Sequence, residues 1–105
     1  AANAIVSTNA QIGKRSIINY QCMIGHDCSI GDDCIFNPGA KISGRVKIGE
    51  KCLIGSNSFI YQGTTIGQNS IIDALTYVKS NIDVNSICSS RISNNNLVCK
   101  NLFNK

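Results

Sequence analysis

Several features are scarce or absent in this sequence of 105 residues, which has no tryptophan, one proline and one histidine. A single histidine excludes a metal site built from several histidines. No apolar run is long enough to cross a membrane, and the first residues do not resemble a secretory signal, so we expect a cytoplasmic protein. The net charge of +4 comes without a dense basic cluster, which argues against nucleic-acid binding. At this length we expect one domain.

The dominant feature of the sequence is a repeat of six residues. A large aliphatic or aromatic residue occupies every sixth position: Val6, Ile12, Ile18, Ile24, Ile30, Phe36, Ile42, Ile48, Ile54, Ile60, Ile66, Ile72 and Val78. The residue two positions earlier is mostly small, as in Ala10, Ser16 and Cys22, and the residue after is often glycine or asparagine. A fixed period of this kind indicates a repeat architecture.

A period of six fits neither an α-helix nor one continuous strand, but it fits short strands joined by tight corners. The large residue then points inward, the small residue leaves room beside it, and Gly, Asn or Asp takes the corner. Three hexads close one triangular coil, and coils stack at about 4.8 Å. Ile12, Ile30, Ile48 and Ile66 would form one buried column. Because stacking buries the core, about four coils suffice.

This pattern resembles the hexapeptide-repeat family, whose fold is a left-handed parallel β-helix. The handedness is implied by the resemblance alone, since the general rule for parallel crossovers predicts the opposite hand. The resemblance implies an all-β protein, with a left-handed parallel β-helix of hexapeptide repeats over residues 1–84. The repeat weakens after Val78, so residues 85–105 are expected to form an irregular C-terminal tail or cap, with a turn at 93–96.

Six cysteines raise the question of disulfides or zinc. Four of them occupy the small inward position, where a thiol packs as a small apolar group: Cys22, Cys28, Cys34 and Cys52. Their spacing is that of the repeat and is no metal signature, so we expect no metal site. Cys34 and Cys52 should be vertical neighbours, which leaves a bridge between them open. Cys88 and Cys99 fall in the tail, where the repeat places neither of them.

The only histidine stands two positions after Ile24, on a corner, so its side chain should point outward. A lone histidine on a surface turn is most often only a surface residue. Histidine is also the commonest general base, because its pKa of about 6.5 lies near working pH. The carboxylate of Asp27, otherwise an ordinary turn residue, would favour the charged imidazolium. His26 is therefore the candidate base and Asp27 its acidic partner.

The segments around this pair resemble one branch of the family, the sugar acetyltransferases that N-acetylate nucleotide-linked 4-amino sugars or O-acetylate sialic acids. The resemblance covers about residues 17–78 and is carried by four segments: 17–19, 26–32, 37–44 and 46–50. It implies that His26 is the general base, that Asp27 makes it more basic, and that Asn19 lies near the acceptor. It also implies that acetyl-CoA, as co-substrate, binds between neighbouring solenoids of a homotrimer, largely through backbone groups, here at Ser56 and Ala74.

Three departures limit what the resemblance implies. Ile35 stands where many relatives carry a second histidine that contacts acetyl-CoA, and residues 90–93 replace a Gly-Asn-Pro-Ala-Lys-like segment. The repeats already run at Val6 without a polar cap, whereas a nucleotide-sugar-binding domain usually precedes them in this branch. We therefore expect that this chain is a piece of a longer protein and that the piece lacks the nucleotide-sugar-binding domain.

The resulting prediction is an acetyl-CoA-dependent acetyltransferase that acts on an amino sugar, with a nucleotide-linked one favoured, for surface-glycan biosynthesis. The resemblance implies direct transfer without an acyl-enzyme, and the inward position of Cys28 beside the histidine favours packing over a role as nucleophile. Two alternatives stay open: O-acetylation of a sugar hydroxyl, and a non-catalytic β-helix scaffold. Four basic residues on the middle coils are either a solvated surface or an attraction for a polyanion such as coenzyme A: Lys41, Arg45, Lys47 and Lys51.

Overall fold

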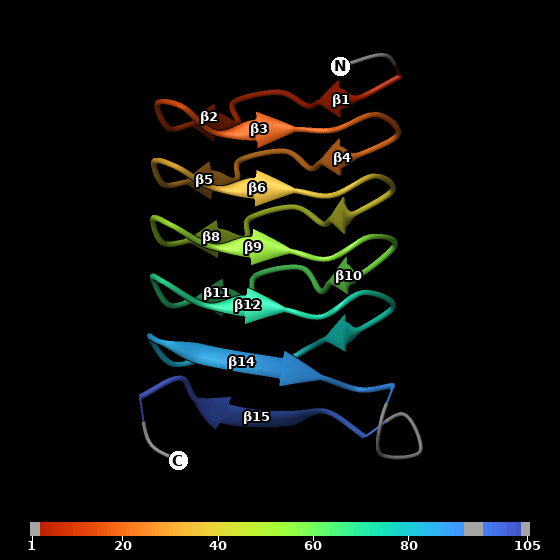
Figure 1. The fold of residues 1–105 in the computed structure, drawn as a ribbon. Coiled ribbons are helices and arrows are strands. Elements are labelled where there is room, and N and C mark those ends of the chain that lie inside the picture. Colours follow the sequence, from red (N-terminus) through yellow and green to blue (C-terminus); the bar gives the residue numbers. More distant parts are fainter. Residues whose placement is uncertain (1–2, 92–95, 104–105) are drawn as a thin grey trace.

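The computed structural model describes residues 3–91 and 96–103. Every regular element in these residues is a strand, and they contain no helix long and apolar enough to cross a membrane. The strands stack into three sheets that form the sides of a triangular tube with extents of 37 × 24 × 21 Å (Figure 1). The prediction of an all-β parallel solenoid of hexapeptide repeats is confirmed, and the coil is left-handed (Figure 1).

The chain passes through the three sheets in turn, and each coil from β1 to β12 adds one strand to each sheet. The first sheet contains β1 (Ile5–Val6), β4 (Met23–Ile24), β7 (Lys41–Ile42), β10 (Phe59–Ile60) and β13 (Tyr77–Val78). The second sheet contains β2 (Gln11–Ile12), β5 (Ser29–Ile30), β8 (Lys47–Ile48) and β11 (Thr65–Ile66). The third sheet contains β3 (Ile17–Ile18), β6 (Ile35–Phe36), β9 (Leu53–Ile54), β12 (Ile71–Ile72), β14 (Ser86–Ser89) and β15 (Val98–Asn101).

Successive coils are in register at eighteen residues, as the parallel pairing of Ile12 with Ile30 and of Ile30 with Ile48 shows. The second residue of each two-residue strand points into the tube. From Ile24 to Val78 these large residues are at most 4% exposed, so they form the continuous core that the repeat predicted. Stacking leaves the core open only near the beginning of the tube, where Val6 is 47% exposed.

The small inward position is a hydrogen-bond donor as well as a packing residue. The Sγ of Cys28 donates to the carbonyl of Ser43 at 3.0 Å, and the Oγ of Ser58 donates to the carbonyl of Asp73 at 2.6 Å. Cysteine and serine are therefore interchangeable here because each donates to a carbonyl fifteen residues on, in the next coil. The inward placement of the first four cysteines is confirmed; Cys34 and Cys52 are free, buried thiols rather than a bridge.

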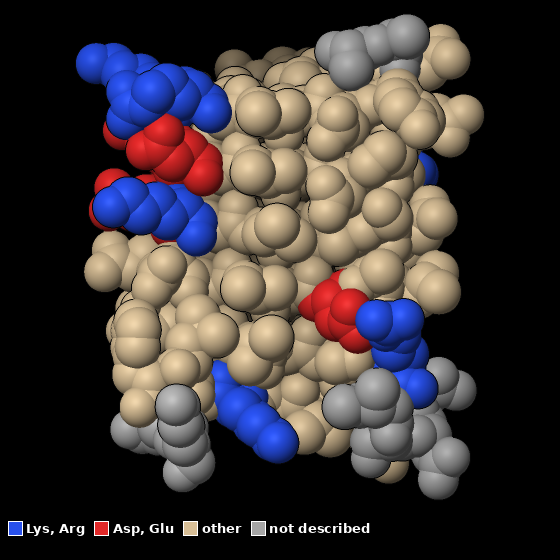
Figure 2. All heavy atoms as spheres, viewed as in Figure 1, with Lys and Arg blue, Asp and Glu red and all other residues tan. Residues whose placement is uncertain are grey.

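The three outer faces differ in polarity. The second sheet presents polar residues: Gln11, Ser29, Lys47 and Thr65. The third sheet presents a line of aliphatic residues from β3 to β14: Ile17, Ile35, Leu53, Ile71 and Ile87. Figure 2 shows that the middle of this face, over β3, β6, β9 and β12, is free of charged side chains. The first sheet is also largely apolar, with Phe59 and Tyr77 in contact at a ring separation of 5.7 Å.

The repeat weakens after Val78 because the next corner is shorter by two residues. Ile82 pairs with Ile66 and Ile87 with Ile71, sixteen residues apart rather than eighteen. The inward positions are therefore filled again, by Ile82 and Cys88, which are 7% and 0% exposed. The sequence pattern counted in sixes did not detect this shift.

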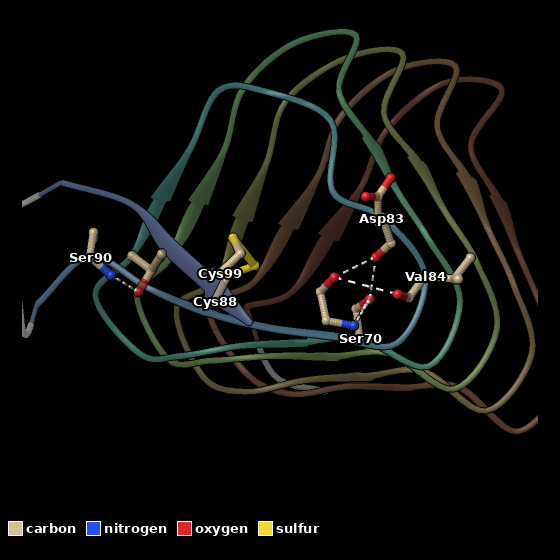
Figure 3. Close-up of a disulfide and its surroundings, with 8 residues drawn as sticks. Ser70, Asp83, Val84, Cys88, Ser90 and Cys99 are labelled. Carbon is tan, nitrogen blue, oxygen red and sulfur yellow. Dashed lines mark hydrogen bonds between the residues drawn. A yellow bond between two sulfur atoms is a disulfide. The ribbon is translucent and has the colours of Figure 1, made fainter. Parts of the chain in front are cut away.

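The end of the tube is covered by a strand that returns along β14. β15 pairs antiparallel with β14, opposite to every other strand pair, and a disulfide joins Cys88 to Cys99 across the two strands (Figure 3). Leu97 packs against the core beside them. Residues 92–95, which hold most of the turn predicted at 93–96, lie outside the described residues.

The corners place twelve described non-glycine residues at a positive φ, and Leu75 is the one apolar residue among them. Leu75 has φ 55° and is 63% exposed, so it has no buried contact to offset a left-handed backbone. Asparagine adopts this conformation more readily than leucine or alanine.

We expect Leu75→Asn to raise the free energy of unfolding by about 1 kcal/mol, because it relieves the left-handed strain. Urea denaturation measures the change. The matched control is Leu75→Ala, which removes the same exposed side chain but tolerates the left-handed backbone less well than asparagine and should bring no such gain. Equal effects of the two substitutions would show that the backbone conformation is not the cause.

Candidate functional site

The single histidine lies on the corner between β4 and β5, which joins the first sheet to the second. Its Nδ1 is 3.0 Å from Oδ2 of Asp27, and the two side chains are 47% and 48% exposed. A carboxylate can only accept, so Nδ1 carries the proton and Nε2 keeps a free lone pair. This arrangement is that of a general base held by an acidic partner.

The neighbouring coils complete the surroundings of Asp27. The hydrogen bond from His26 is the main reason that the pKa of this carboxyl lies below its ordinary value of 3.8. A hydrogen bond from the side chain of Asn9, one coil earlier, and the charge of Arg45, one coil later, lower the pKa of Asp27 further, while partial desolvation opposes them. The ionised form of Asp27 is therefore stabilised from both adjacent coils.

Backbone hydrogen bonds fix the corner that carries the pair. The amide of Asp27 donates to the carbonyl of Thr8 at 3.0 Å, and the amide of Arg45 donates to the carbonyl of His26 at 2.8 Å. Asp27 itself has φ 59°, a conformation that aspartate tolerates better than most residues. The site is thus supported by the ladder between coils rather than by a flexible loop.

The remaining predicted site residues lie on another corner, between the third and first sheets. Ser56 and Ala74 are close together in successive coils, since the amide of Leu75 donates to the carbonyl of Ser56 at 2.9 Å. Asn19 lies on the same corner two coils earlier, and its Nδ2 donates to the carbonyl of Phe36 at 3.0 Å. The structure therefore brings Ser56 to Ala74 but separates both from His26 by the width of the first sheet.

The cysteine that follows the histidine by two residues does not act as a nucleophile. The thiol of Cys28 is 2% exposed, and burial raises its pKa, so it lacks the reactivity of a nucleophile. In the described residues no three metal-binding side chains gather into one group. Ile35, in place of a second histidine, belongs to the aliphatic line on the outer face of the third sheet.

The basic residues of the middle coils do not form one patch. Lys41 lies on β7 and its Nζ donates to the carbonyls of Gln21 and Gly39, at 2.8 and 2.9 Å. Arg45 lies on the next corner and Lys47 on β8, so the side chains point in different directions around the coil. Their placement favours the interpretation as a solvated surface.

Sequence comparison assigns the repeats to a family. Residues 9–44 and 27–62 match the bacterial transferase hexapeptide family, described as six repeats, and residues 45–80 match the hexapeptide repeat of succinyl-transferase. These matches define the class of protein, a hexapeptide-repeat solenoid of a transferase family. The chain belongs to the bacterial transferase hexapeptide family. No curated protein sequence matches it.

Solved structures with the same fold include three transferases. The acetyltransferase VCA0836 of Vibrio cholerae O1 biovar eltor, in complex with acetyl coenzyme A, is 18% identical at a TM-score of 0.83, covering 96% of this chain and 66% of that protein. A histidine-to-alanine mutant of GDP-perosamine N-acetyl transferase from Caulobacter crescentus, with CoA and GDP-perosamine, is 21% identical at 0.63, covering 93% and 53%. The acetyltransferase domain of PglB from Neisseria gonorrhoeae FA1090, with acetyl coenzyme A, is 24% identical at 0.60, covering 83% and 51%. The chain thus spans between about half and two thirds of these proteins.

The lowered pKa of Asp27 predicts a pH-dependent contribution to stability. Because the folded pKa lies below the unfolded value near 3.8, the contribution is complete above that value and is lost as pH falls through the folded pKa. We expect Asp27→Asn to be less stable than the wild type at pH 7, and the difference to shrink as the pH is lowered below 3.8.

Urea denaturation of both proteins across this pH range measures the difference. Glu50→Gln is the control, because its exposed carboxylate makes none of the side-chain hydrogen bonds or ion pairs found in the described residues. A gap between Asp27→Asn and the wild type that stays constant with pH would contradict the assignment.

Proposed function

We propose that this protein is an acetyl-CoA-dependent acetyltransferase that modifies an amino sugar, with His26 as the general base. The observation that carries the proposal is the His26–Asp27 pair, 3.0 Å apart and half exposed on a rigid corner. The fold and family are those of transferases, and two of the similar structures hold acetyl coenzyme A. The amino sugar is supported by the similar structure that holds GDP-perosamine. Such a product suits the synthesis of surface glycans.

The chemistry follows from the free Nε2 of His26. As the acceptor nitrogen attacks the thioester carbonyl, a C–N bond forms, the C–S bond breaks and Nε2 takes the proton from the amine. The imidazolium then returns the proton to the departing thiolate, which leaves as free coenzyme A. Asp27 holds Nδ1 and stabilises the imidazolium while it exists. Because the acceptor attacks directly, no cysteine nucleophile is needed.

The corner that carries Ser56 and Ala74 fits the thioester arm of acetyl-CoA. Both side chains are small, so they leave the backbone accessible to an extended chain. The carbonyls of Ser56 and Ala74 each accept one hydrogen bond, from Leu75 and from Thr76, and each has a second lone pair for an amide of the ligand. The amide of Ala74 is already used, since it donates to Asp73 at 2.9 Å.

We propose a homotrimer because one chain keeps the two halves of the site apart. His26 and the Ser56–Ala74 corner flank opposite margins of the first sheet, so a complete site needs His26 of one copy and the corner of another. The largely apolar outer faces of the first and third sheets suit packing between copies, whereas the polar second sheet suits contact with water.

Release of free thiol from acetyl-CoA, with a panel of amino sugars and matched sugar alcohols, tests the activity. We expect turnover with an amine acceptor, and His26→Ala should lower kcat by about 10² to 10⁴-fold because the general base is lost. Cys28→Ser should keep the wild-type kcat. Turnover on hydroxyls alone would favour O-acetylation, whereas no turnover and no acetyl-CoA binding by calorimetry would favour a scaffold.

Mixing two inactive variants tests the shared site. His26→Ala removes the base, and Ala74→Trp places a bulky ring at the proposed thioester corner. Each variant alone should be inactive, but trimers assembled from both after co-expression should regain part of the activity, since some interfaces then combine two intact halves. Failure of these mixed trimers to recover activity would indicate that the site does not combine residues of two copies.

A further inference from the structure

Gly44 differs from the other eight glycines in the atoms that occupy the place of its missing side chain. At six of them an added β-carbon would lie within 2.6 Å of the next coil: Gly13, Gly25, Gly31, Gly49, Gly55 and Gly67. Their atoms of closest approach are backbone atoms, so the coil spacing itself requires glycine there. Gly39 and Gly63 have φ values of 80° and 77°, which favour glycine for conformational reasons.

At Gly44 the obstacle is the imidazole of His26. An added β-carbon would lie 2.4 Å from Nε2, 2.7 Å from Cε1 and 2.8 Å from Cδ2, and these are the three nearest atoms. The histidine ring therefore lies against the Cα of Gly44, in the space that a side chain would fill. Gly44 is also not among the residues with a positive φ.

The repeat shows that the backbone does not demand glycine at this place. The same corner position in the other hexads holds a residue with a side chain: Thr8, Lys14, Tyr20, His26, Asp32, Pro38, Glu50, Ser56, Gln62, Gln68 and Ala74. Gly44 is the only glycine in that series from residue 8 to residue 80. It occurs directly beneath the only histidine, one coil of eighteen residues later.

Together these contacts hold the ring in two directions. Asp27 fixes Nδ1 at 3.0 Å, and the open Cα of Gly44 supports the ring at its Nε2 edge. The hydrogen bond from the amide of Arg45 to the carbonyl of His26 keeps the two coils in register at this point. A side chain at position 44 would push Nε2 away while leaving the ladder between the coils intact.

We propose that Gly44 is a positioning residue for His26: its absent side chain provides the seat on which the imidazole lies, with Nδ1 on Asp27 and Nε2 hydrogen-bonded to no described residue. The inference rests on the proposed role of His26 as the base. The seat itself can be tested without turnover, because the protein has a single histidine and therefore a single imidazole signal.

Gly44→Ala is the primary test. By nitrogen-15 spectroscopy of the imidazole, the wild type should be mainly the Nδ1–H tautomer in its neutral form, and the variant should lose that preference. The carboxyl of Asp27, followed by carbon-13 titration, should move back toward its ordinary pKa as the His26 hydrogen bond weakens. With an active acceptor, kcat should fall at least about tenfold and the KM for acetyl-CoA should change less than about twofold.

Gly63→Asn is the matched control, one coil below Arg45. A β-carbon there meets nothing within 4 Å, and asparagine tolerates its φ of 77° better than most residues. This control should leave both the tautomer and kcat unchanged. An unchanged tautomer and kcat in Gly44→Ala would overturn the proposal.

Thermal unfolding of Gly44→Ala, in the wild type and in His26→Ala, distinguishes a role of Gly44 in seating the histidine ring from a general role in packing. Gly44→Ala should shift the midpoint in the wild type but not in His26→Ala, because the obstructing ring is gone. Equal shifts in both backgrounds would overturn the proposal. If the wild type turns over no acceptor but Gly44→Ala changes the tautomer of His26, the proposed function fails and the role of Gly44 stands. If the wild type turns over an acceptor but Gly44→Ala leaves the tautomer unchanged, the proposed function stands and the role of Gly44 fails.

Discussion

The ladder of backbone hydrogen bonds between coils is the constraint on which the rest of this structure depends. Each two-residue strand pairs in parallel with the strand eighteen residues away, so every position has one vertical neighbour above and one below. The size and polarity of each side chain must therefore fit the side chains eighteen residues before and after it, with which it forms one column. The inward columns satisfy this by alternating large apolar residues with small ones, several of which donate to a carbonyl of the next coil, and no buried side-chain nitrogen or oxygen in the described residues lacks a partner.

The same constraint assembles the candidate site from residues far apart in sequence. Asn9, Asp27 and Arg45 form one column, and Asn9 and Arg45 add to the hydrogen bond from His26 in lowering the pKa of the Asp27 carboxyl. His26 and Gly44 form the next column, in which the missing side chain of one admits the ring of the other. Such a site is stiff because displacing any member requires disturbing the ladder, which is the kind of support that proton transfer at a fixed distance needs.

A solenoid must also end, because its last strands expose unpaired hydrogen-bonding groups. Here the register shortens from eighteen to sixteen residues, and β15 then reverses direction to cover β14. The Cys88–Cys99 disulfide ties the covering strand to a residue that is itself in the core. The same residue type thus serves as a packing thiol within the coils and as a covalent link at their end.

The sequence by itself determined the parallel coil, the core and the corner histidine, because a strict period of six buries every sixth side chain, whereas the left hand of the coil was implied only by the family resemblance. It also identified His26 with Asp27, since these are neighbours in the chain. The eighteen-residue register follows from three hexads per coil, but only the tertiary structure decided which side chains meet within it: the Gly44 seat, the contributions of Asn9 and Arg45 to the pKa of Asp27, and the separation of Ser56 and Ala74 from the histidine by the first sheet. It also decided the pairing of Cys88 with Cys99, because a two-residue shift and an antiparallel return leave no period to count. The hydrophobic period sets the register of the coils, but the orientation of each corner side chain depends on its neighbours in the adjacent coils, which no six-residue pattern specifies.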